Sequence, residues 1–183
     1  MSSGVCVVIS TVDIDNKIDN KIENKYLTNK QIKMKRVSAG IIVDKDGKIL
    51  LARRASTESL SGWYEFPGGK LELHETAEMA LIRELKEELD IDCNILCHFR
   101  DTKFKYDTGL VKLCFYWVKT ENPKNSFKMN VHDDFVWIDP INFDKYKILV
   151  SNHSICLRIL HLYFANNNKL PDRKSTRLNS SHT

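Results

Sequence analysis

Long hydrophobic runs are missing from this sequence, and this absence excludes an integral membrane protein. No apolar run approaches the ~20 residues that a helix needs to cross a bilayer. The short apolar stretch at residues 5–9 has no basic residue before it, so it makes a poor signal peptide. We therefore expect a protein with no membrane as a partner.

Paired cysteines and a strong excess of one charge are also missing. The five cysteines are odd in number and form no C-x-x-C pair, which predicts free thiols in a reducing cytoplasm. The formal net charge is +4, and residues 172–182 supply +2 of it with three bases and one acid. The remaining excess is too small to predict a nucleic acid polymer as a partner.

Both ends of the chain differ in composition from the middle. Residues 1–31 are rich in Asn, Lys, Asp and Ile without core periodicity, so we expect a segment that is disordered or translated from upstream of the true start. Met34 is then an alternative initiator. Residues 172–183 look like a translated sequencing adapter and are expected to be an artefactual tail. Residues 35–166 remain and suffice for one domain with a substantial apolar core.

Strand and helix patterns alternate through this middle region. Residues 37–43 and 48–53 flank Asp46-Gly47, which predicts a hairpin. Further strands are expected at residues 94–104, 110–120 and 135–138. The second of these three is almost continuously apolar at residues 114–118, which predicts a central strand.

The last apolar pattern, over residues 154–164, favours a helix. Its apolar residues Ile155, Ile159 and Leu162 fall on one helical face. Residues 155, 157 and 159 also alternate, so a strand stays an alternative there. With the acidic helix described next, two helices would pack around the strands.

An unusually acidic helix is predicted at residues 77–89. Thr76 is a plausible N-cap, and apolar residues recur at every fourth position from Ala77 to Leu89. Residues 75–90 contain six acids and two bases, a net charge of −4. Like charges on one helical stripe repel, and a hard cation with oxygen ligands would relieve the repulsion. Magnesium or manganese fits this description.

The spacing around this helix is more specific than its charge. The order is Gly69, five residues, Glu75, seven residues, Arg83-Glu84-Leu85, one residue, Glu87-Glu88, one residue, Asp90 and Ile91. This pattern resembles the signature of the Nudix (MutT-type) hydrolase family, and the run at residues 63–68, WYEFPG, looks like the lead-in of MutT-type members. The resemblance implies an α/β fold, the Nudix α/β/α sandwich with a mixed sheet.

Two positions depart from the family pattern. Asp90 stands where the family has a glycine near the helix end. Because Asp tolerates a left-handed backbone better than most residues, we expect a stability cost of about 1 kcal/mol there. His74 stands where many relatives have glycine, and we expect a loop residue rather than half of a catalytic dyad.

The resemblance implies roles for the matching residues. The metal ligands would be the side chains of Glu84, Glu87 and Glu88 with the backbone carbonyl of Gly68, holding Mg²⁺ or Mn²⁺. Glu75 and Arg83 match a catalytic-site pair that joins loop and helix. Glu84 is the first choice for the general base, with Glu75 or a residue of a later loop as alternatives. In that later loop Val131 replaces a glutamate of some relatives, so Asp133 or Asp134 either substitutes for it or is an ordinary turn acid.

Three residues are candidates for substrate binding, each with a plainer alternative. Arg54, predicted to end a strand, either meets the nucleotide or lies on the surface. Phe66 either stacks on a base or packs in the core. Asn152 matches a base-reading asparagine of the members that hydrolyse 8-oxoguanine nucleotides, or it is an ordinary helix N-cap.

The activity implied is Mg²⁺-dependent hydrolysis of a phosphoanhydride bond by a nucleoside triphosphate pyrophosphohydrolase. The products would be a nucleoside monophosphate and pyrophosphate, and 8-oxo-dGTP is one candidate substrate. The alternatives are a Nudix hydrolase of a dinucleoside polyphosphate or nucleotide sugar, and a non-catalytic Nudix nucleotide sensor. We also expect a nucleotide as the substrate. The protein is expected to be a monomer or homodimer located in the cytoplasm.

Overall fold

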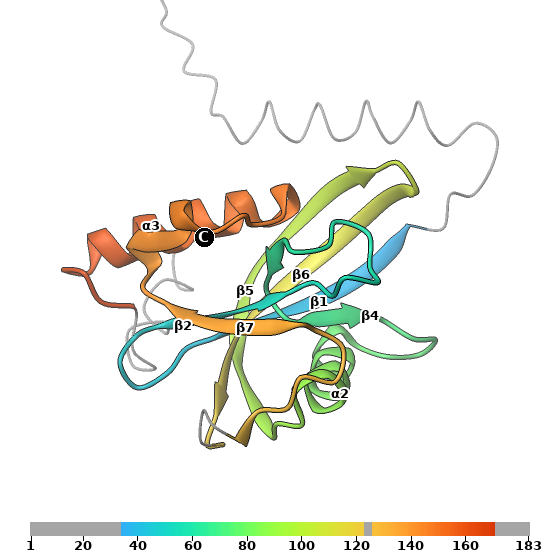
Figure 1. Cartoon of the computed structure of the whole chain (residues 1–183), viewed down its shortest axis with the longest axis horizontal. Coiled ribbons are helices and arrows are strands. Elements are labelled where there is room, and N and C mark those ends of the chain that lie inside the picture. Colours follow the sequence, from blue (N-terminus) through green and yellow to red (C-terminus); the bar gives the residue numbers. More distant parts are fainter. Residues whose placement is uncertain (1–33, 123–125, 171–183) are drawn as a thin grey trace, which may run out of the picture. The chain divides into compact units, whose positions relative to one another are not determined.

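The computed structural model describes residues 34–122 and 126–170, and these residues form two β-sheets and two α-helices (Figure 1). The predictions for residues 1–31 and 172–183 lie outside the described residues. Within the described residues, none of the helices has both the length and the apolar character needed to cross a membrane.

The larger sheet is mixed. Its four strands run in the order β4 (Gly68–Lys70), β1 (Lys35–Ile42), β6 (Gly109–Thr120) and β5 (Cys93–Tyr106). Strands β1 and β6 are parallel, and the other neighbours are antiparallel. The smaller sheet is antiparallel, with the order β3 (Tyr64–Glu65), β2 (Ile49–Arg53) and β7 (Asp134–Ile138).

Strand β6 is apolar on both faces because each face lies in a core. Phe115 and Trp117 belong to one buried cluster, whereas Tyr116 and Val118 belong to the other. Side chains alternate between the faces of a strand, so a strand covered on both sides needs a continuous apolar run. The predicted central position of this strand is confirmed.

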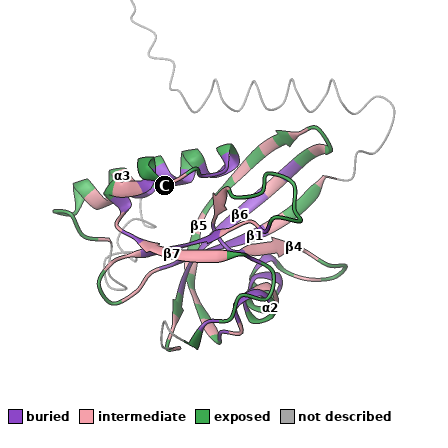
Figure 2. Ribbon diagram, viewed as in Figure 1, coloured by how far each residue is buried: buried purple, intermediate pink, exposed green. Residues whose placement is uncertain are grey.

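The two helices cover opposite faces of the sheets. Helix α2 (Ala77–Leu89) contributes fully buried leucines to one core, and α3 (His153–Ala165) contributes Ile155 and Ile159 to the other. Figure 2 shows that the buried residues of α2 line one side of the helix while the opposite side is exposed. Two short 3₁₀ helices, η2 (Pro140–Lys145) and η3 (Val150–Asn152), precede α3. This arrangement confirms the predicted α/β/α sandwich, and the helical alternative is the correct one for residues 154–164.

The predicted hairpin around Asp46-Gly47 is only partly correct. The turn is present, since the Asp44 N–H donates to the Lys48 carbonyl at 3.0 Å. Beyond one bridge between Val43 and Ile49, however, the two strands enter different sheets. Both edges of β1 are occupied, one by β4 and the other by β6, so β2 pairs with β3 and β7 instead.

Candidate active site

Both ends of helix α2 are fixed as the sequence predicts. The Thr76 side chain accepts a hydrogen bond from the Met79 N–H at 3.2 Å. At the other end Asp90 takes the left-handed conformation, with φ 53°. Ion pairs with Lys128 and Lys86 lower the pKa of the Asp90 carboxyl. The helix therefore begins and ends at defined residues, which fixes where its glutamates project.

A salt bridge joins this helix to the loop before it. Arg83 donates from Nε to Glu75 Oε1 at 2.8 Å and from a terminal nitrogen to Glu75 Oε2 at 3.0 Å. The same terminal nitrogen donates to the Lys70 carbonyl at 3.1 Å. The hydrogen bonds from Arg83 and from the Glu72 N–H lower the pKa of the Glu75 carboxyl to about 2. The structure thus brings together the pair that the sequence predicts to join loop and helix.

His74 lies in this loop as expected. Its side chain is exposed and its φ is +70°, a conformation that glycine adopts freely. The backbone therefore explains why relatives would carry glycine there, and nothing in the described geometry makes His74 part of a dyad.

Arg83 also reaches two carboxylates on its own helix. A terminal nitrogen lies 3.0 Å from Glu84 Oε1 and 3.2 Å from Glu87 Oε2. Hydrogen bonds to Glu75 and Glu84 raise the pKa of Arg83, so the guanidinium is always charged. The guanidinium of Arg83 therefore contacts three of the acids that the sequence places at the site.

Glu84 lies directly over Gly69 of strand β4. A Cβ added to Gly69 would stand 2.3 Å from the Glu84 carboxyl carbon and within 2.5 Å of both its oxygens. Such contacts are far below van der Waals distance, so only glycine leaves room for the carboxylate at this position.

Glu88 is buried, with an exposed fraction of 8%. One of its oxygens accepts a hydrogen bond from the Gly68 N–H at 3.1 Å. Burial raises the pKa of the Glu88 carboxyl to about 7, and the charge of Glu84 adds to the rise. His132 and the Gly68 N–H act against it but do not cancel it.

These residues fit a divalent cation by their chemistry, although they do not form a closed cage. Among the described residues no three His, Cys, Asp or Glu side chains are grouped as a ready metal site. Glu87 turns toward Arg83, and its side chain is 58% exposed. Glu84 and Glu88 meet the backbone at Gly69 and Gly68. A buried carboxylate with a raised pKa and neighbouring oxygen donors is a set that Mg²⁺ or Mn²⁺ would stabilise.

Arg54 is engaged within its own loop. It directly follows β2, which ends at Arg53. Its Nε donates to the Ser59 carbonyl, and its terminal nitrogens pair with Glu58 and Glu65. The side chain is only 18% exposed. Arg54 therefore holds the loop that it begins, and contact with a nucleotide stays a prediction.

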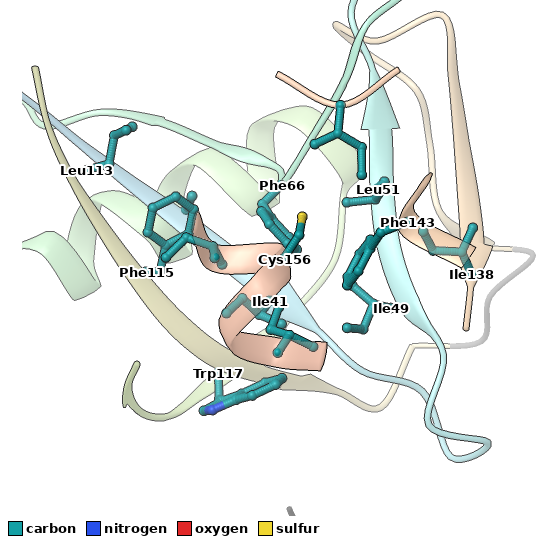
Figure 3. Packing of buried hydrophobic residues seen from close by; sticks show 14 of the residues in the cluster. Ile41, Ile49, Leu51, Phe66, Leu113, Phe115, Trp117, Ile138, Phe143 and Cys156 are labelled. Carbon is teal, nitrogen blue, oxygen red and sulfur yellow. The ribbon is translucent and has the colours of Figure 1, made fainter. Parts of the chain in front are cut away.

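Phe66 packs in the core. Its ring is 3% exposed and makes edge-to-face contacts with Phe115 and Phe143, at centroid distances of 5.8 Å and 6.5 Å. Figure 3 shows these rings together inside the cluster next to α3. This burial supports the packing alternative, and base stacking by Phe66 stays a prediction.

Asn152 lies at the N-terminus of α3 but does not cap it. Its side chain makes no capping hydrogen bond, and the residue is 5% exposed. The preceding Ser151 accepts a hydrogen bond from the Tyr106 hydroxyl at 2.8 Å. The N-cap alternative therefore fails for the side chain, and base reading stays a prediction.

The two aspartates near the start of β7 both accept backbone hydrogen bonds. Asp133 Oδ2 accepts from the Ser56 N–H at 2.9 Å, and Asp134 Oδ1 accepts from the Phe135 N–H at 2.9 Å. The Asp134 contact is local, as in an ordinary turn acid, whereas Asp133 binds a residue far away in the sequence. Substitution of either aspartate for the missing glutamate stays a prediction.

Glu65 and His132, for which no role was predicted, lie beside Glu88. His132 is 8% exposed, and its Nε2 lies 3.7 Å from Glu65 Oε1. Burial lowers the pKa of His132, but Glu65 and Glu88 outweigh it and leave the pKa raised. Glu65 lies in β3 and His132 lies in the loop before β7, so the contact joins segments far apart in the sequence and no local spacing could reveal it.

Known proteins share both this sequence pattern and this fold. The family model described as NUDIX domain matches residues 34–155. The CTP pyrophosphohydrolase of Escherichia coli K12 is 34% identical over 109 residues, which cover 60% of this chain and 78% of that protein. The 8-oxo-dGTP diphosphatase of Proteus vulgaris is 46% identical over 67 residues, 35% of this chain, and the match spans 60% of that relative's length.

Solved structures agree with these matches. The E. coli ORF135 protein superposes with a TM-score of 0.62 at 29% identity, covering 72% of this chain and 92% of that one. A MutT protein from Methanosarcina mazei Go1 gives a TM-score of 0.64 at 18% identity, over 74% and 96% of the two chains, and shares the fold. Since the family model covers more than half of the sequence, this chain belongs to the NUDIX domain family, the Nudix hydrolases that its sequence resembles.

Proposed function

We propose that this protein is a divalent-metal-dependent nucleoside triphosphate pyrophosphohydrolase that releases a nucleoside monophosphate and pyrophosphate. The observation that supports it most is the pair of carboxylates at the double glycine, Glu84 over Gly69 and the buried Glu88 at Gly68. Glu84, Glu87, Glu88 and the Gly68 carbonyl would hold Mg²⁺ or Mn²⁺. When bound, the ion would polarise a phosphoryl oxygen and neutralise developing charge.

The side chains then divide the remaining work. Water attacks one phosphorus of the phosphoanhydride, and the bridging oxygen leaves with the other phosphate group. Glu84 takes the proton of that water as general base. Arg83 orients Glu84 through their 3.0 Å contact, and Glu75 holds Arg83 from the loop. Glu84 can therefore accept the proton while Arg83 and Glu75 stay in place.

Substrate choice is proposed from relatives that carry the same pattern. One of them is named for CTP and another for 8-oxo-dGTP, and both are nucleoside triphosphates. A magnesium-dependent screen of triphosphates, dinucleoside polyphosphates and nucleotide sugars, read as phosphate or pyrophosphate release, tests the proposal. We expect pyrophosphate from a triphosphate. Preference for the other two classes would contradict it, and hydrolysis of none by the folded protein would favour a nucleotide sensor.

Asn152→Ala is expected to weaken recognition of the preferred base. Because the buried amide makes no capping bond, its removal should change the free energy of unfolding by less than about 1 kcal/mol. Losing hydrogen bonds to the base should raise KM about 10-fold. KM measurements with the preferred and a non-preferred triphosphate check this. An unchanged KM with a clear loss of stability would instead make Asn152 a structural residue.

We also propose a cytoplasmic protein. The four cysteines in the described ranges, 34–122 and 126–170, are free thiols, as a reducing compartment predicts. The protein is proposed to be a monomer or a homodimer, and sedimentation velocity distinguishes these two states.

A further inference from the structure

The loop between β6 and β7 binds the end of helix α2. The Lys128 N–H donates to the Leu89 carbonyl at 3.0 Å, and the Asn130 N–H donates to the Glu88 carbonyl at 3.1 Å. The Asn130 side chain adds a third bond, from Nδ2 to the Glu87 carbonyl at 2.7 Å. Carbonyls of a last helical turn have no partner within the helix, so this loop supplies three partners in succession.

The same segment is held at both of its ends. Phe127 is buried and its ring lies 5.9 Å from the rings of Phe135 and Trp137. At the other end His132 is buried beside Glu65, and the next N–H, of Asp133, donates to the Arg53 carbonyl at 3.1 Å. Residues 127–133 are therefore fixed to the smaller sheet and also hydrogen-bonded to the end of α2.

We propose that residues 127–132 act as a clamp that sets the position of the last turn of α2, with Asn130 as the positioning residue for Glu87 and Glu88. This inference rests on the proposed function, in which those two side chains help to hold the metal. Asn130 is singled out because both its backbone and its side chain bind the carbonyls of these same two residues. A small rotation of that turn would displace both carboxylates together.

An ordinary helix cap would have the same contacts but a different consequence. A cap contributes to stability alone, whereas a positioning residue also changes metal affinity. Asn166 offers a matched control, because its Nδ2 donates to the Lys169 carbonyl at 3.2 Å at the end of the other helix, α3. Asn166→Ala removes the same kind of bond at a place without the site's carboxylates.

The experiment compares Asn130→Ala, Asn166→Ala and wild type in the full chain. Mn²⁺ affinity is measured by electron paramagnetic resonance of the free ion, and amide hydrogen exchange is followed at residues 87–90. We expect Asn130→Ala to lose roughly 5-fold in Mn²⁺ affinity, the equivalent of one net hydrogen bond. Its last turn of α2 should also exchange faster. Asn166→Ala should keep wild-type values of both.

The outcomes separate the clamp from the proposed function. Wild-type Mn²⁺ affinity in folded Asn130→Ala, or an equal loss in Asn166→Ala, would overturn the clamp. Unchanged exchange at residues 87–90 in Asn130→Ala would overturn it as well. A wild-type protein that binds Mn²⁺ but hydrolyses no nucleotide would leave the clamp measurable and overturn the proposed function instead.

Discussion

Glu88→Gln is expected to lower turnover by at least about 100-fold while making the metal-free protein more stable. The loss follows because Gln keeps the shape and an oxygen but removes the charge that would bind the cation, and a metal supplies several kcal/mol to the transition state. The higher stability follows from the burial of the Glu88 carboxyl. Above pH 7 the folded protein keeps Glu88 ionised at a cost, whereas the unfolded chain ionises it freely above its ordinary value of 4.5. At pH 8 the gain in the free energy of unfolding should be about 3 kcal/mol.

Pyrophosphate release and urea unfolding in EDTA measure the two effects. Glu78→Gln is the control, since Glu78 is an exposed acid in the first turn of the same helix. Its turnover should stay within about 2-fold of wild type. Wild-type turnover in Glu88→Gln would remove this carboxylate from the site, and reduced stability at pH 8 would contradict the account of its burial.

Gly69→Ala is expected to fold normally and to lose most activity. The new methyl group would collide with the Glu84 carboxyl, 2.3 Å away, and with no backbone atom among its nearest contacts. The end of a flexible side chain can swing aside cheaply, so the free energy of unfolding should change by less than about 1 kcal/mol. Glu84, the proposed general base, would then leave its position, and kcat should fall by roughly 100-fold, since general bases contribute 10²–10⁴-fold.

The neighbouring glycine gives the contrast. A Cβ at Gly68 would lie 2.2 Å from the Ser38 carbonyl oxygen, and its φ of +139° strains any other residue. Gly68→Ala should therefore lose roughly 3 kcal/mol of stability. Kinetics and thermal unfolding of both variants decide the matter. If Gly69→Ala kept wild-type kcat, the Glu84 carboxylate would not need its position over β4.

Local features of this protein could be predicted from the sequence. Helix α2 and its ends follow from spacing and from cap chemistry, because Thr76 and Asp90 act on backbone within one turn. The Glu75–Arg83 contact was also expected, from the family pattern. In each case the decisive interaction lies within about ten residues of the chain.

Features that depend on distant partners could not be predicted. The two strands that flank Asp46-Gly47 enter different sheets because both edges of β1 pair with β4 and β6. No residue near the turn indicates this pairing. The packing of Phe66 against Phe143, which lies far along the chain, is a second contact of this kind. The approach of His132 to Glu65 likewise joins a loop and a strand that are separated in the sequence by three strands and a helix. Such contacts come from tertiary packing and leave no periodicity in the sequence.

The central proposal is that the carboxylates of Glu84, Glu87 and Glu88 hold a divalent cation for phosphoanhydride hydrolysis. Calorimetric Mg²⁺ titration of EDTA-stripped wild type and of a Glu84→Gln/Glu88→Gln double variant tests this most directly, with pyrophosphate release measured at each Mg²⁺ concentration. We expect saturable Mg²⁺ binding to wild type, hydrolysis that rises with this binding, and neither binding nor hydrolysis in the folded double variant. Equal binding by both proteins, or full hydrolysis by wild type in EDTA, would contradict this proposal.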